Sequence, residues 1–81
     1  MPYIHEDARG ELDWADRHAE TAGELNYMIT VELVEYLDRK GLSYQVINDI
    51  LGALEGAKLE FYRRVAVPFE QDKCVLNGDV F

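Results

Sequence analysis

The sequence has little cysteine and no long hydrophobic run. Its 81 residues include one cysteine, Cys74, which excludes an internal disulfide and is typical of an intracellular thiol. No stretch approaches the roughly 18 apolar residues of a membrane-spanning helix. No basic segment followed by an apolar one opens the chain either. The sequence therefore predicts a cytoplasmic protein that does not enter a membrane.

Basic residues are also scarce. Eight Lys and Arg residues stand against 16 Asp and Glu, and the formal net charge is −8. Direct nucleic-acid binding is disfavoured, because phosphate contacts need a surplus of Lys and Arg. The acidity serves solubility on one interpretation, and on another it fits a protein partner with a basic surface.

The sequence also lacks residue patterns typical of catalytic, metal-binding or nucleotide-binding sites. His5 and His18 have neither the spacing of a zinc-binding helix nor a cysteine nearby. Cys74 follows Lys73, which could lower the thiol pKa, but no base is identifiable. No phosphate-binding loop, dinucleotide-binding glycine pattern or nucleophile elbow is present. We therefore expect no catalytic residue, no metal site and no cofactor.

What the chain does have is apolar residues, at 48% of the sequence. Its length predicts a single domain, over residues 1–81, and a domain of this size has a marginal core. Three short helices cannot hide so much apolar surface, which favours a homo-oligomer.

The longest predicted helix covers residues 43–67. Ser43 is a good N-cap, and Pro68 is expected to stop the helix because it cannot continue the hydrogen-bond ladder. Between them, apolar residues recur at helical spacing. They are Ile47, Ile50, Leu51, Leu54, Phe61, Tyr62 and Val65.

A second helix is predicted over residues 24–40. Thr21 and Glu24 match a capping box, and Gly41 is a suitable residue just after the helix end. Because only residues 41–43 connect it to the longer helix, we expect the two to form an antiparallel hairpin.

The two ends of the chain are less regular. Residues 5–22 predict a weak, broken N-terminal helical region. Residues 68–81 predict a tail, in which another turn or two of helix over residues 69–74 is left open. β-Favouring residues at Tyr3–Ile4 and Val80–Phe81 leave open a short terminal β-ribbon. The expected fold is all-α, with the broken helix followed by the hairpin.

Two glycines in the longer helix predict a close contact. Gly52 and Gly56 lie one turn apart beside Ala53 and Ala57, and each glycine costs about 1 kcal/mol relative to alanine within a helix. A neighbouring helix would explain this low-relief strip, and so would a ligand or a symmetry-related copy.

Charged residues cluster further along the same helix. Lys58, Arg63 and Arg64 fall within seven residues, and Glu60 is spaced to pair with both arginines. The cluster is either a set of surface ion pairs or part of a pocket for a small anionic or nucleotide-like ligand. Such a pocket would also use aromatic and amide side chains, namely Tyr62, Tyr27 and Asn26.

Three motifs carry a resemblance: GELNYMIT, GALEGAKLEFYRRVAVPFE and the terminal NGDVF. With the opening PYI, they resemble a family of short proteins of unknown function, found in bacteriophages and scattered bacteria, that end in NGDVY. Phe81 replaces the usual tyrosine. The resemblance covers nearly the whole chain. It implies that the protein is located in the cytoplasm of a bacterial host cell, but it implies no role for any residue.

Arg63, Arg64 and Pro68 are also similar to the helix ending of phage proteins that sequester cyclic-nucleotide signals of bacterial immunity. The leading hypothesis is therefore a non-enzymatic, oligomeric binding protein that sequesters a small anionic ligand. The alternative is an acidic inhibitor that covers a basic partner surface.

Overall fold

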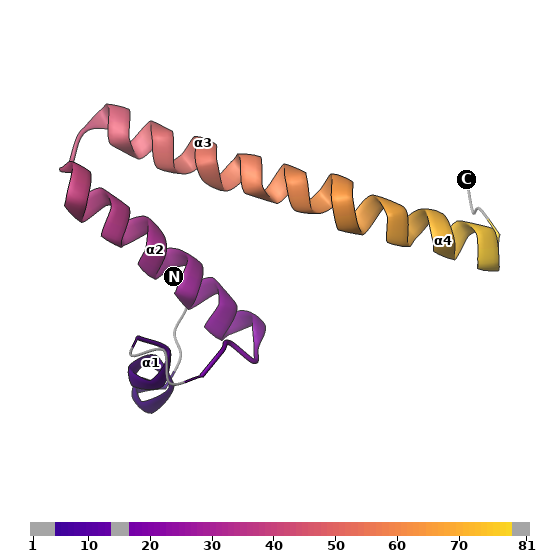
Figure 1. Ribbon diagram of the computed structural model, residues 1–81, viewed down its shortest axis with the longest axis horizontal. Coiled ribbons are helices and arrows are strands. Elements are labelled where there is room, and N and C mark those ends of the chain that lie inside the picture. Colours follow the sequence, from indigo (N-terminus) through magenta and orange to yellow (C-terminus); the bar gives the residue numbers. More distant parts are fainter. Residues whose placement is uncertain (1–4, 14–16, 79–81) are drawn as a thin grey trace. The chain divides into compact units, whose positions relative to one another are not determined.

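The computed structural model describes residues 5–13 and 17–78, and every regular element in these ranges is helical. The chain forms two compact units, Met1–Ile47 and Asn48–Phe81, and each is described by itself. Figure 1 shows the helices along the chain. The all-α prediction is confirmed for the described residues.

The first unit begins with α1, Glu6–Asp13. Glu6 and Asp7 lie in its first turn, where negative charge stabilises the positive end of the helix dipole. Helix α1 packs against α2 and buries Leu12, whose exposed fraction is 1%. Leu12 is the only fully buried large side chain among the described residues. The described residues of this unit therefore contribute a very small core.

The next helix, α2, spans Ala22–Lys40 and confirms the predicted caps. The amide of Glu24 donates to Thr21 Oγ1 over 3.1 Å, and Gly41 ends the helix with a φ of 90°. Only one half of the capping box forms. The Glu24 carboxylate accepts from the amide of Glu20 instead of that of Thr21, because it also binds an arginine described below.

Helix α3 covers Tyr44–Phe61. The amide of Val46 donates to Ser43 Oγ over 3.1 Å, which confirms Ser43 as the N-cap. The helical rise then continues without a break through the next two elements (Figure 1).

The predicted stop at Pro68 is wrong. Residues Tyr62–Ala66 form a π-helical turn, η1, and α4 follows over Val67–Asn77 with Pro68 in its first turn. The amide of Val67 reaches back five residues to the carbonyl of Tyr62. This wider turn accommodates a residue that has no amide hydrogen and whose ring would clash with the carbonyl four residues earlier. Residues 68–77 are therefore helical, which is longer than the turn or two left open for residues 69–74.

The C-terminal helix ends at Gly78, where φ is 85° and the amide donates to the carbonyl of Cys74 over 2.8 Å. Two other predictions remain predictions. The antiparallel hairpin would join residues of both units, and the terminal β-ribbon falls on residues 3–4 and 80–81, outside the described ranges.

Candidate functional site

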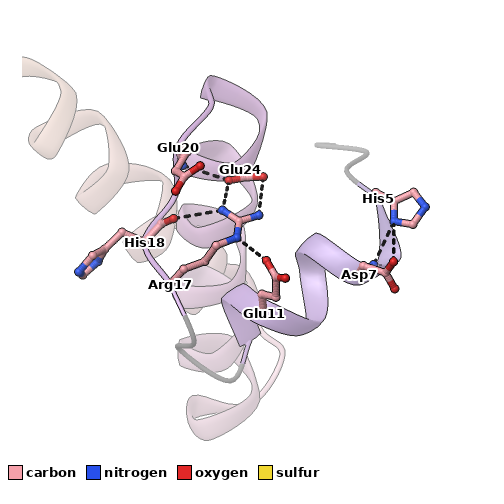
Figure 2. Close-up of polar contacts among 7 residues, drawn as sticks. All are labelled: His5, Asp7, Glu11, Arg17, His18, Glu20 and Glu24. Atoms are coloured by element: carbon pink, nitrogen blue, oxygen red, sulfur yellow. Dashed lines mark hydrogen bonds and ion pairs between the residues drawn. The ribbon is translucent and has the colours of Figure 1, made fainter.

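The most connected polar group in the first unit is the guanidinium of Arg17. It donates to both carboxylate oxygens of Glu24, over 2.6 and 2.8 Å, and to the carbonyl of His18 over 3.2 Å. It also binds the carboxylate of Glu11 in α1. Figure 2 shows Arg17 between the two carboxylates, with the Glu20 amide completing the contacts of Glu24. One arginine therefore ties α1 to the start of α2.

These contacts change the acidity of Glu24. The two hydrogen bonds from Arg17, and then the one from the Glu20 amide, lower the pKa of the buried Glu24 carboxyl to about 2. The same carboxylates raise the pKa of Arg17. A carboxylate that accepts three donors is a poor base, so this network serves structure and not catalysis.

A second contact also links α1 to α2. The hydroxyl of Tyr27 lies 2.7 and 2.8 Å from the two carboxylate oxygens of Asp13 and donates to that carboxylate. This hydrogen bond raises the pKa of Tyr27, because the neutral phenol is the donor. Tyr27, predicted for a ligand pocket, is thus engaged within its own unit.

The basic cluster lies on the surface of the second unit. Lys58 Nζ is 3.8 Å from the Glu55 carboxylate, while Arg63 and Arg64 both bind the carboxylate of Glu60, with Arg64 Nε at 2.7 Å. All three cationic side chains are at least 67% exposed. Ion pairs this exposed contribute little to stability. Two arginines on one carboxylate leave a local excess of positive charge.

The other predicted pocket residues are divided between the units. Tyr62 lies in η1 and is half exposed. Asn26 belongs to α2, where its carbonyl accepts from the Thr30 hydroxyl over 2.9 Å. Because Asn26 and Tyr27 lie in the first unit and the basic residues in the second, a shared pocket stays a prediction.

The glycine strip has open space beside it. A Cβ added at Gly52 or Gly56 would meet no atom within 4 Å among the described residues. Ala53 and Ala57 are exposed as well. No close contact at this strip is present within the second unit, and its predicted packing role stays a prediction.

The apolar face that the sequence predicts for the longer helix is exposed, together with apolar side chains of α4. Helices α3 and α4 and the turn η1 contain no buried residue. Their exposed large apolar side chains are Tyr44, Ile47, Leu51, Leu54, Leu59, Phe61, Tyr62, Val65, Phe69, Val75 and Leu76.

Residues 1–80 match one family model, Domain of unknown function (DUF6899). The chain belongs to this family. The match confirms the resemblance to a family without an assigned function, while the phage origin stays a prediction. No curated protein and no solved structure matches the chain. The DUF6899 family thus gives no activity to carry over.

The described residues offer neither a membrane-spanning helix nor a metal-binding cluster. None of their helices has the length and apolar character needed to cross a membrane. The described residues also contain no group of three or more His, Cys, Asp and Glu side chains able to hold a metal ion.

Proposed function

We propose that this DUF6899 chain is a non-enzymatic binding protein that works as a homo-oligomer. The observation that carries the proposal is the exposed apolar surface of α3, η1 and α4, in which no side chain is buried. A helix that buries none of its side chains is only marginally stable in water, so this surface needs a cover. Contiguous exposed apolar surface of this kind is typical of an interaction site.

The solution mass tests this proposal. Sedimentation equilibrium of the full chain should give a multiple of 9.3 kDa at micromolar concentration. A monomer whose helical circular dichroism does not change on dilution would contradict it.

The ligand that we propose is a small anion of nucleotide type, bound at Arg63 and Arg64. Its support is electrostatic, since two guanidinium groups share the single Glu60 carboxylate and Tyr62 lies beside them in η1. Arginine forks bind phosphate groups well, and an aromatic ring can stack on a base. A host bacterium's nucleotide signal would be a suitable ligand if the chain is phage-encoded.

A thermal-shift assay against a panel of mono-, di- and cyclic nucleotides tests the ligand. At least one nucleotide should raise the melting temperature, and Arg63→Ala should remove that rise. Lys73→Ala is the matched control, because Lys73 is an exposed base on α4 whose Nζ lies 5.5 Å from the Phe69 ring centroid, away from the arginine pair. A panel without any shift would contradict the proposal.

The alternative is an acidic module that covers a basic protein surface. The observation that favours it is the uneven charge, because residues 1–47 carry ten acidic and four basic residues, whereas residues 48–81 carry six and four. Such a protein should bind basic partners through its first unit and lose them as salt rises, since exposed charges are screened. Indifference to salt would contradict this alternative.

A further inference from the structure

Six residues of α3 share one face with the spacing of a coiled-coil seam. Their separations alternate strictly between three and four residues. They are Tyr44, Ile47, Leu51, Leu54, Lys58 and Phe61. The five apolar members are 37% to 89% exposed, so nothing within a single unit covers the seam. Five apolar positions and one lysine give each helix a seam with a single polar position.

From this pattern we infer that α3 pairs with α3 of a second copy, antiparallel, so that each Lys58 lies beside the partner's Glu55. The inference rests on the proposed self-association and specifies its surface and direction. A single lysine within a seam is a known device for fixing register and partner at a cost in stability.

The glycines agree with this choice of face. Successive residues of an α-helix are about 100° apart, so Gly52 and Gly56 point away from the line of Leu51, Leu54 and Lys58. Their surroundings are open, with no atom within 4 Å of an added Cβ. The low-relief strip is therefore the outer side of the pair, and the seam is the inner side.

The charge of Lys58 favours an antiparallel over a parallel arrangement of the two α3 helices. In a parallel pair the two Lys58 side chains would face each other in one layer, and burying like charges together is costly. In an antiparallel pair, Lys58 can instead lie level with the partner's Leu54. The same register sets Leu51 against Phe61 within α3. It sets Ile47 level with Val65 of η1 and Tyr44 level with Pro68 of α4.

Charge also selects this register. Glu55 follows Leu54 and so flanks the layer that contains the partner's Lys58. Within one chain the two groups are already 3.8 Å apart, and pairing of copies would bring a second carboxylate to each lysine. A shift by one heptad would replace Glu55 with the uncharged Asn48 at this layer and leave the lysine without the partner's carboxylate.

Helix α2 of the same chain is a poorer partner for the α3 seam than a second copy is. A hairpin closed at residues 41–43 would set Asn26 about level with Lys58, because both helices rise about 1.5 Å per residue. Glu24 is the only carboxylate within three residues of that level, and Arg17 already binds it. A second copy therefore satisfies the lysine where the hairpin would not.

Spin-label distances test the direction. Each label is attached to one cysteine in a Cys74→Ser chain, so every distance measured is between copies. In this register, position 46 lies level with position 66 of the partner, 20 residues away, and position 57 with position 55, two residues away. Two labels at Val46→Cys should therefore be offset by about 30 Å along the helix axis, and two labels at Ala57→Cys by about 3 Å. Both sites lie outside the seam.

The outcomes separate this inference from the proposed function. A long distance at position 46 and a short one at position 57 would support the antiparallel pair. Similar short distances at both sites would overturn it while self-association stands. A monomeric mass with no distance between copies would overturn both and assign the seam to α2 in the same chain.

Charge reversal tests the lysine layer. Lys58→Glu and Glu55→Lys should each weaken self-association at least about tenfold. An equimolar mixture of the two variants should restore it, because each new charge then meets an opposite one across the pair. Lys73→Glu is the control and should leave the association constant unchanged. Failure of the mixture to associate better than either variant would overturn the proposed register.

Discussion

The guanidinium of Arg17 donates two hydrogen bonds to the carboxylate of Glu24, over 2.6 and 2.8 Å. This bidentate pair, extended to Glu11, joins α1 to α2 in a unit whose fully buried apolar side chains, among the described residues, are limited to Leu12. Because so few apolar side chains are buried there, hydrogen bonds between charged groups contribute much of what holds α1 against α2. Bidentate arginine–carboxylate pairs are the geometry best suited to that role.

The first prediction concerns the stability of the chain at acidic pH. The pKa of Glu24 is about 2 in the folded chain against an ordinary value of 4.5, so its contribution to stability is fully present above pH 4.5. This contribution is lost as the pH falls from about 4.5 to about 2. We expect Glu24→Gln to melt at a lower temperature than the parent at pH 7, with a difference that shrinks towards pH 2. Thermal melts by circular dichroism measure this.

Glu32→Gln is the matched control for acid, because Glu32 is an exposed carboxylate on the same helix. Its melting temperature should follow that of the parent at every pH. Equal pH profiles for Glu24→Gln and Glu32→Gln would contradict the role of the Arg17 pair.

The second prediction concerns the ionisation of Tyr27 at basic pH. The pKa of Tyr27 is raised above 10.0 because its hydroxyl donates to Asp13, so the stability from this contact is present below pH 10 and lost as the pH rises through the raised value. Titration of tyrosinate absorbance should show a tyrosine that ionises late. Tyr27→Phe should remove that late step, whereas Tyr44→Phe, at an 89% exposed position, should leave it in place.

The third prediction decides the role of the glycine strip. Gly52→Ala and Gly56→Ala should each stabilise the chain by about 1 kcal/mol, because alanine is the better helix former and the added methyl meets nothing. Urea unfolding measures the change. Gly41→Ala is the contrast and should destabilise by about 1–2 kcal/mol, since its φ is 90°. A loss of stability at positions 52 and 56 would instead show that a helix packs there.

The fourth prediction concerns the π-helical turn. Pro68→Ala should keep the helix continuous and stabilise it, by up to about 3 kcal/mol, because an amide donor is restored and the ring is removed. The new amide should be protected from hydrogen exchange. Gln71→Ala, an exposed site on α4, should change stability by only a few tenths of a kcal/mol. Loss of helical signal in Pro68→Ala would contradict this account.

The helix starts and one helix end could be predicted because their causes are local. Thr21 and Ser43 bind amides three residues away, and Gly41 needs only its own freedom at positive φ. The helical spacing of the apolar residues likewise depends on nearest turns. The Glu60 ion pairs also belong to this class, since both partners lie within four residues on one helix.

The sequence by itself therefore determined the helical class, the caps of α2 and α3 and the surface ion pairs. Tertiary structure decided how Arg17 is used: it lies on Glu24, seven residues away across a bend, where sequence patterning suggested only a capping box. The continuation of the helix through Pro68 is local but was still missed, because the backbone can widen one turn where a rule based on single residues predicts an end.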